Sequence, residues 1–250
     1  MPLYVKELFK SYGKTVAVRG ISFTAQEGKV FGLLGPNGAG KTTTLKIIAT
    51  VLKPDSGSVF LNDTDVINDP ERAREYISYV PEDAGTYRNL TGYEHLTFAA
   101  TVYAKNEKEY DEFLEDGIKI ADLGDKIHYK TKSYSKGMKR RLQIARALMI
   151  KPRLAVLDEP TAGIDVFHAI NIRNIIKDFA VKNSSIVIVS SHNMFEVEKL
   201  CDEIGIINEG VLLRVGSVKE IKGNSQDLEE VFIKLAKGDQ TEPQKGEIKG

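Results

Sequence analysis

A glycine-rich stretch that ends in a lysine and a threonine carries the clearest chemistry in the sequence. It follows the apolar run Val30–Leu34 and matches the pattern G-x-x-x-x-G-K-[ST] over residues 35–42. Glycines let the backbone curl so that successive N–H groups point at phosphate oxygens, and the helix that follows adds partial positive charge. In this pattern Lys41 reaches the β- and γ-phosphates, and the Thr42 hydroxyl binds Mg²⁺. The predicted nucleotide-binding residues of this loop are Gly35, Pro36, Asn37, Gly38, Ala39, Gly40, Lys41, Thr42 and Thr43.

Two adjacent carboxylates, Asp158 and Glu159, follow a second apolar run, Leu154–Leu157. A carboxylate at the end of a buried strand can hold Mg²⁺, and a second can polarise an attacking water. An Asp-Glu pair after a strand is by itself more typical of a solvated loop. With the phosphate loop upstream, we predict that Asp158 binds magnesium and that Glu159 activates the water.

Both motifs need strands and helices that hold them in place, and the hydrophobic pattern predicts an alternation of the two. Short apolar runs bounded by glycine, and a glycine loop between strand and helix, favour a mostly parallel sheet with helices on its faces. The central block at 82–150 has helical periodicity and almost no strand signal, which indicates a helical insertion. The predicted strands are 3–9, 16–25, 30–34, 59–61, 77–80, 154–157, 186–189, 203–207 and 211–215, and the predicted helices are 43–52, 93–103, 107–123, 137–149, 166–181, 194–201 and 228–235.

Composition limits the classes of function. The 250 residues include 35 Lys and Arg against 35 Asp and Glu, a neutral balance that argues against nucleic-acid binding through bulk charge. A single cysteine, Cys201, excludes an internal disulfide framework and is expected to be inert core. No apolar run approaches the ~20 residues needed to cross a bilayer, and no signal peptide is visible. We therefore expect a soluble intracellular chain that reaches a membrane only through another protein.

Three further motifs make the pattern specific. Tyr134–Arg141 precedes the carboxylates, Pro160–Asp165 follows them, and Ser190-Ser191-His192 follows the next predicted strand. In this order the motifs resemble the nucleotide-binding domain of ABC (ATP-binding cassette) proteins over residues 3–218. The resemblance implies an α/β P-loop NTPase fold with a mostly parallel sheet core, an N-terminal antiparallel β part and an inserted α-helical subdomain at about 83–150. It also implies an ATPase domain over 1–222, followed at 223–250 by a C-terminal helix and a disordered tail.

The resemblance implies roles for residues outside the two nucleotide motifs. Tyr134–Met138 corresponds to the signature loop, in which Ser135 and Gly137 bind ATP, and Ala162–Asp165 to the dimer-contacting D-loop. His192 would be the switch histidine that contacts the γ-phosphate, which makes it catalytic together with Glu159 and Lys41. Tyr12 would stack on adenine, and Glu82 would stand at the Q-loop as a ligand for the metal or a water. Each has a simpler reading: Ser135 and Asp165 as helix caps, Tyr12 as packing, and His192 as a structural histidine.

The sequence departs from the family pattern at two places. Glu82 stands where the family usually has Gln, and it adds charge. The signature reads Tyr-Ser-Lys-Gly-Met, so Met138 cannot make the hydrogen bonds of the usual Gln. Together the two departures resemble the ATPases of ABC-2-type multidrug, antibiotic and ion exporters.

The function that the resemblance implies is hydrolysis of ATP, with Mg²⁺, to power transport, in the export direction, through a separate membrane permease. Two ATPase subunits, identical or paralogous, would face head to tail, with each ATP between residues 35–43 of one and Ser135–Gly137 of the other. The block that carries Glu82 and Arg88 would contact the permease and so place the chain at the cytoplasmic face of the cell membrane.

Two other classes remain as alternatives. One is a soluble ABC ATPase acting on nucleic acid or ribosomes, and the other is a P-loop kinase or GTPase switch. The basic residues Lys136, Lys139, Arg140 and Arg141 are interpreted as a solvated helix face rather than a nucleic-acid patch, and no nucleic-acid partner is expected.

Overall fold

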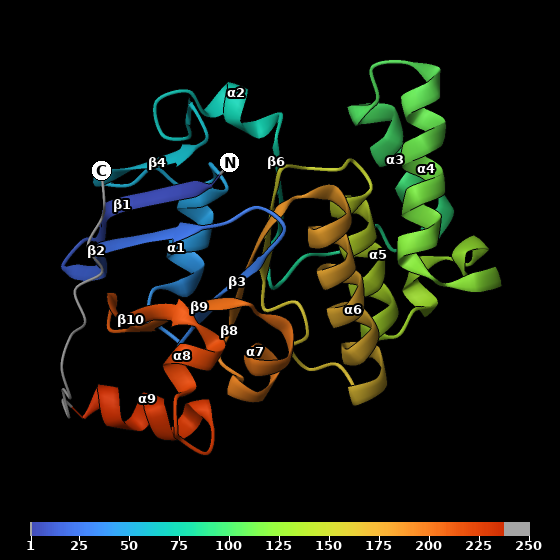
Figure 1. Ribbon diagram of the computed structural model, residues 1–250. Helices are drawn as coiled ribbons and strands as arrows, with labels where there is room; N and C mark the ends of the chain where they lie inside the picture. Colours follow the sequence, from blue (N-terminus) through green and yellow to red (C-terminus); the bar gives the residue numbers. More distant parts are fainter. Residues whose placement is uncertain (1, 238–250) are drawn as a thin grey trace.

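Two β-sheets pack on opposite sides of helix α1 (Lys41–Ile48) in the computed structural model, which describes residues 2–237 (Figure 1). The first sheet has the strand order β2-β1-β4-β5, and all of its pairs are antiparallel. Its strands are β1 (Leu3–Tyr12), β2 (Thr15–Ala25), β4 (Ser56–Leu61) and β5 (Thr64–Asp65). This sheet is the predicted N-terminal antiparallel part.

The second sheet has six strands in the order β10-β9-β3-β8-β7-β6 and is parallel except for the β9–β10 pair. Its register pairs Asp158 at the end of β7 with Ser190 near the end of β8. The carboxyl ends of neighbouring parallel strands therefore meet at one edge, where α/β sheets bind ligands. The strands are β3 (Val30–Leu34), β6 (Ile77–Val80), β7 (Leu154–Asp158), β8 (Ile186–Ser191), β9 (Glu203–Asn208) and β10 (Val211–Ser217).

The central strands are buried on both faces, which explains their unbroken apolar sequences. Along β3, Phe31 and Leu33 pack in the core that contains α1, whereas Val30 and Leu34 pack in the core on the opposite face. That second core is covered by helices α6 (Val166–Asn183), α7 (Met194–Leu200), α8 (Val218–Lys222) and α9 (Leu228–Ala236). The sheet is thus fixed from both sides.

A third core lies among helices α3 (Gly92–Tyr103), α4 (Glu107–Ala121) and α5 (Lys136–Leu148), at the end of the molecule far from β1 and β2 (Figure 1). A capping box of Thr91 and Glu94 starts α3, because each side chain bonds the other's backbone N–H. Helix α5 also contributes Ile144 and Leu148 to the core of the six-stranded sheet. Through α5 the helical insertion is therefore attached to the six-stranded sheet.

The predicted strands and long helices are present, with ends that shift by a few residues. The largest shift is in α1, which begins and ends earlier than the predicted helix 43–52. The prediction missed β5, α2 (Pro70–Arg74) and α8, each of five residues or fewer, because so short a segment shows no periodicity. The predicted disordered tail falls almost wholly on 238–250, outside the described residues. Within residues 2–237, no helix has the length and apolar character of a membrane span.

Candidate nucleotide-binding and catalytic site

The phosphate loop runs from the end of β3 to the start of α1 and is fixed by backbone contacts. The Gly35 N–H donates to the Ser191 carbonyl at 3.3 Å, and the Gly210 N–H donates to the Ala39 carbonyl at 3.0 Å. Gly40 has φ +103°, and a Cβ there would lie 2.4 Å from the Ala17 carbonyl oxygen. The close approach and the positive φ both require glycine. The first N–H groups of α1 have no acceptor within the helix and face the loop, so they are available to an anion.

Lys41 places its ammonium group inside this loop. It is 6% exposed, and Nζ donates to the carbonyls of Gly35 at 2.7 Å and Pro36 at 3.1 Å. Nζ also lies 3.8 Å from Glu159 Oε1. Burial lowers the pKa of Lys41, while the carboxylates of Glu159, Asp158 and Glu82 oppose that shift. The loop therefore holds one positive point charge beside the carboxylate of Glu159.

Ser190 links the Asp158 carboxylate to the backbone of Glu159. Its hydroxyl donates to Asp158 Oδ1 at 2.5 Å and accepts from the backbone N–H of Glu159 at 2.9 Å. Both carboxylates are buried, at 1% and 7% exposure for Asp158 and Glu159. Glu159 has φ +49°, a left-handed conformation that costs a non-glycine residue roughly 1–2 kcal/mol. Such strain persists where the surroundings fix the backbone, as they do at this turn.

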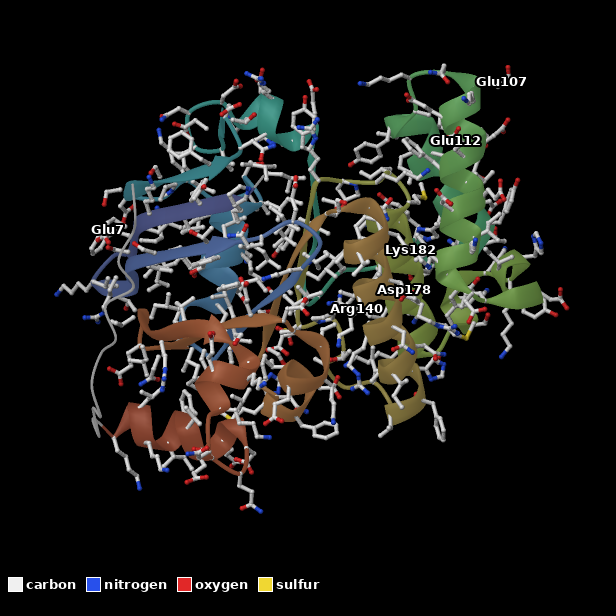
Figure 2. All side chains as sticks on the ribbon, viewed as in Figure 1. Glu7, Glu107, Glu112, Arg140, Asp178 and Lys182 are labelled. Atoms are coloured by element: carbon white, nitrogen blue, oxygen red, sulfur yellow. The ribbon has the colours of Figure 1, made fainter. Side chains whose placement is uncertain are left out.

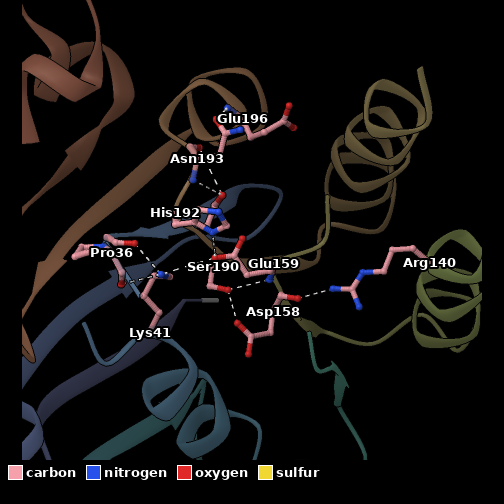
Figure 3. A network of polar contacts seen from close by, with 11 residues as sticks. Pro36, Lys41, Arg140, Asp158, Glu159, Ser190, His192, Asn193 and Glu196 are labelled. Atoms are coloured by element: carbon pink, nitrogen blue, oxygen red, sulfur yellow. Dashed lines mark hydrogen bonds and ion pairs between the residues drawn. The ribbon is translucent and has the colours of Figure 1, made fainter. Parts of the chain in front are cut away.

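His192 follows β8 directly and closes the network (Figure 3). Its Nδ1 lies 2.8 Å from Glu159 Oε1, while half of the imidazole remains exposed. The next residue, Asn193, caps α7 by accepting from the Glu196 N–H at 3.2 Å. The Glu159 carboxylate thus lies between the ammonium of Lys41 and the imidazole of His192. Three distant segments of the chain meet at this point.

The residues predicted to bind magnesium have suitable donor chemistry. Asp158 supplies a buried carboxylate, and no side chain or backbone group among the described residues hydrogen-bonds the Thr42 hydroxyl. Glu82 is exposed, yet its charge acts on both Lys41 and Arg140. In residues 2–237, no three His, Cys, Asp or Glu side chains form a ready cluster for a metal. A Mg²⁺ ion held by Asp158 and Thr42 would take its remaining oxygen ligands from phosphate groups and water, as Mg²⁺ commonly does in proteins.

The signature segment lies at the N-terminus of α5, beside the start of α6. Ser135 caps the helix by accepting from the Met138 N–H at 3.2 Å. A Cβ at Gly137 would lie 2.9 Å from the His168 ring, so this approach of α5 to α6 requires glycine. Asp165 caps α6, accepting from the His168 N–H at 3.1 Å. Both cap predictions agree with these contacts. Within the described chain, Ser135 has no hydrogen bond to the phosphate loop.

Tyr12 lies apart from the charged network. It is the last residue of β1, it pairs with Thr15 across the turn to β2, and half of its side chain is exposed. The structure brings together the phosphate loop, Asp158, Glu159 and His192. It leaves Tyr12 and Ser135 with no hydrogen bond to any of these groups among residues 2–237.

The interpretation of the basic run as a solvated helix face is wrong for two of its residues. Arg140 and Arg141 are only 6% and 9% exposed. Arg140 donates Nε to the Pro160 carbonyl at 3.2 Å, Nη1 to the Pro81 carbonyl at 2.9 Å, and Nη2 to the Asp158 carbonyl. Sequence reasoning missed this contact, because a run of basic residues on a helix with an apolar stripe is more typical of its solvated face.

Comparisons with known proteins agree with this arrangement. The family model described as ABC transporter matches residues 18–162. The linearmycin resistance ATP-binding protein LnrL of Bacillus subtilis is 37% identical over 219 residues, which cover 88% of this chain and 70% of LnrL. The lipopolysaccharide export system ATP-binding protein LptB of Acidithiobacillus ferridurans is 36% identical, covering 88% of this chain and 91% of LptB. A solved ATP-binding subunit of an ABC transporter superposes with a TM-score of 0.84 at 28% identity, covering 94% of this chain and all of that one.

Proposed function

This chain belongs to the ABC transporter family as an ATPase subunit that energises transport through a membrane permease, and from that premise we propose how its residues bind and hydrolyse ATP. The observation that carries the proposal is the position of the Glu159 carboxylate. It lies 2.8 Å from His192 Nδ1 and 3.8 Å from Lys41 Nζ, at the carboxyl edge of the parallel sheet. A buried carboxylate held by an imidazole and an ammonium group is suited to orient and deprotonate a water beside a phosphate.

We assign the phosphates of ATP to residues 35–43. Backbone N–H groups of the loop and of the first turn of α1 contact the phosphate oxygens, and Lys41 neutralises charge on the β- and γ-phosphates. Thr42 and Asp158 would hold Mg²⁺, which when bound would neutralise charge on the phosphates. Glu82 would contribute an oxygen to the ion or to its water, and Tyr12 stacks on adenine. The exposed position of Tyr12 supports a role in stacking, because its ring is accessible to the adenine base.

In hydrolysis, Glu159 accepts a proton from the attacking water, whose oxygen forms the new bond to the γ-phosphorus. His192 contacts the γ-phosphate and orients Glu159. The bond between the γ-phosphorus and its bridging oxygen breaks, and ADP and phosphate are released. Lys41 stabilises the negative charge that is spread over the phosphoryl oxygens in the transition state.

A second ATPase subunit completes each site, and a second copy of this chain is sufficient to supply it. The exposed Ser135 at the N-terminus of α5 supports this arrangement, because a helix N-terminus without an anionic partner is suited to bind a phosphate. Ser135 and Gly137 of one subunit contact the γ-phosphate bound at residues 35–43 of the other. ATP then joins the two subunits, and its hydrolysis releases them, so ligand binding controls the equilibrium between closed and open pairs.

The helical insertion contacts the permease at the inner face of the cell membrane. The part of it that follows Glu82 exposes apolar and aromatic side chains, which is typical of a protein-binding surface. Tyr87, Phe98, Val102 and Tyr103 are each more than half exposed. The names of two relatives, linearmycin resistance and lipopolysaccharide export, support outward transport.

Steady-state phosphate release tests the assignment of Glu159. Glu159→Gln keeps the size of the side chain and one acceptor oxygen and removes the base, so we expect at least a hundredfold loss of kcat with ATP still bound. The matched control is Glu112→Gln, which removes an exposed carboxylate from α4, where its ion-pair distances are 3.9 Å. It should retain the wild-type rate. Equal rates for the wild type and Glu159→Gln would refute the proposed catalytic role.

A further inference from the structure

We propose that Arg140 is a positioning residue for ATP hydrolysis, which fixes the Glu159 turn and the segment before Glu82 to the signature helix α5. This inference rests on the proposed catalytic role of Glu159. It goes beyond that role, because it assigns a function to a residue outside the nucleotide motifs. Arg140 is buried and is labelled near the middle of the view in Figure 2, whereas Glu107 and Glu112 are exposed and lie on α4.

One guanidinium group donates to three backbone carbonyls. The acceptors are Pro81, directly after β6, and Asp158 and Pro160, on either side of Glu159. Strands β6 and β7 are parallel neighbours, so these carbonyls lie at the same edge of the sheet. Figure 3 shows Arg140 reaching from its helix toward Asp158. Arg140 therefore connects α5 to the ends of both strands.

The contact requires arginine rather than any cation. Arginine has five N–H donors in a rigid planar fork, whereas lysine is a flexible point charge with three donors. Arg140 is nearly fully buried, and within residues 2–237 no carboxylate forms an ion pair with it. Its hydrogen bonds all go to carbonyl groups of the main chain. A buried charge bonded only to main chain fixes the position of that main chain, because each lost bond leaves a buried polar group unsatisfied.

The backbone around Glu159 is held from two sides. Ser190 accepts its N–H, and Arg140 binds the carbonyls of the residues before and after it. Glu159 has a positive φ, so its carboxylate points toward His192 only while this turn is maintained. Loss of the Arg140 fork allows the turn to relax and moves the carboxylate away from the attacking water. An error of about 1 Å in such a group is enough to slow catalysis severely.

Arg140 also connects this turn to the ATP site that Ser135 is proposed to complete in the partner subunit. Ser135 begins the helix that carries Arg140 five residues later, and the N-terminus of that helix is assigned to the partner's γ-phosphate. Because a helix moves as a rigid unit, a shift of α5 upon partner binding moves the Arg140 side chain and with it both strand ends. ATP bound on one face of the subunit thereby influences the geometry of Glu159 on the other.

The kinetics of Arg140→Lys and Arg140→Gln test this role on the full chain. We expect kcat to fall at least tenfold in Arg140→Lys and further in Arg140→Gln, while the KM for ATP stays within twofold, because neither change touches the phosphate loop. The matched control is Arg141→Lys. Arg141 is the adjacent buried arginine of α5, but it donates to the Asp122 carbonyl at the end of α4, at 2.7 Å, and should retain wild-type kcat. Rates are compared below the melting temperature of every variant.

Glu159→Gln is measured in parallel to separate the two proposals. If Glu159→Gln is inactive while Arg140→Lys has the wild-type kcat, the role of Arg140 is overturned and the proposed function stands. If Arg141→Lys loses as much kcat as Arg140→Lys, the effect is general destabilisation and the role of Arg140 is again overturned. If Glu159→Gln hydrolyses ATP at the wild-type rate, both proposals are overturned. Should Arg140→Gln fail to fold, Arg140→Lys, which retains the charge, decides the question.

Discussion

Single residues of the site depend on one another, because several charged groups are removed from water in a small volume. Lys41, Asp158 and Glu159 are each less than a tenth exposed, and burial of an unpaired charge is costly. The ammonium of Lys41 and the carboxylate of Glu159 reduce this cost for each other. The Ser190 hydroxyl and the exposed His192 ring complete the hydrogen bonds of the two carboxylates. Removal of one member therefore affects the others.

Replacement of Lys41 by alanine should weaken nucleotide binding. The change removes the one positive side-chain charge inside the phosphate loop, and a charged hydrogen bond contributes about 1.5–3 kcal/mol, roughly a tenfold to hundredfold change in Kd. Titration with a fluorescent ATP analogue measures the effect. Lys46→Ala, five residues along the same helix, is the control and should bind normally. Unchanged affinity of Lys41→Ala would contradict the assignment of the loop.

Replacement of Ser190 by alanine should destabilise the protein through its hydrogen bonds. The change leaves the buried Glu159 N–H without an acceptor and Asp158 without a donor, so we expect the free energy of unfolding to fall by about 1–3 kcal/mol. Urea denaturation provides the measurement. Ser78→Ala in β6 is the matched control, because its buried hydroxyl has no hydrogen-bond partner in the described structure. If both variants lost the same stability, hydroxyl removal itself would be the cause and the bridging role would be wrong.

Among the elements, those with a strong local signal could be predicted from the sequence. The unbroken apolar runs 30–34, 154–157 and 186–189 become the central strands β3, β7 and β8, since a strand buried on both faces needs apolar residues at every position. The phosphate loop was equally predictable, because its glycines are required locally. The role of Arg140 could not be predicted, because its three hydrogen-bond acceptors come from two other segments of the chain. The sequence around a charged residue on a helix does not show which main-chain groups will surround that residue.

Two substitutions of Ser135, at the N-terminus of helix α5, distinguish a role in capping this helix from a role in an ATP site shared between two subunits. Ser135→Ala removes the cap and should lower stability by about 1 kcal/mol. Ser135→Arg should lower it by a similar amount, but in addition it places a bulky charged side chain where the partner's phosphate is assigned. We therefore expect Ser135→Arg to bind ATP as a monomer and to lack hydrolysis, whereas Ser135→Ala retains part of it. Full ATPase activity of Ser135→Arg would leave only the capping role.

Across the whole molecule, the two groups proposed to act on one ATP lie on different elements of the chain. Residues 35–43 follow β3, and Ser135 caps α5, the helix that joins the six-stranded sheet to the helical insertion. In the described chain no hydrogen bond connects Ser135 to the phosphate loop of its own subunit. In the proposed pair of subunits, one ATP molecule contacts the phosphate loop of one subunit and Ser135 of the other. The same helix, α5, packs against the insertion, whose exposed apolar side chains are proposed to contact the permease.

Native mass spectrometry of Glu159→Gln with ATP and Mg²⁺ tests this account most directly, because it reports the number of chains and the identity of the bound nucleotide together. If Glu159 is the base and ATP joins two subunits, the dominant species contains two chains and two molecules of ATP. The double variant Glu159→Gln/Ser135→Arg should then be a single chain with ATP. A single chain for Glu159→Gln under conditions that saturate it with ATP, or a pair of chains that carries ADP, would contradict the account.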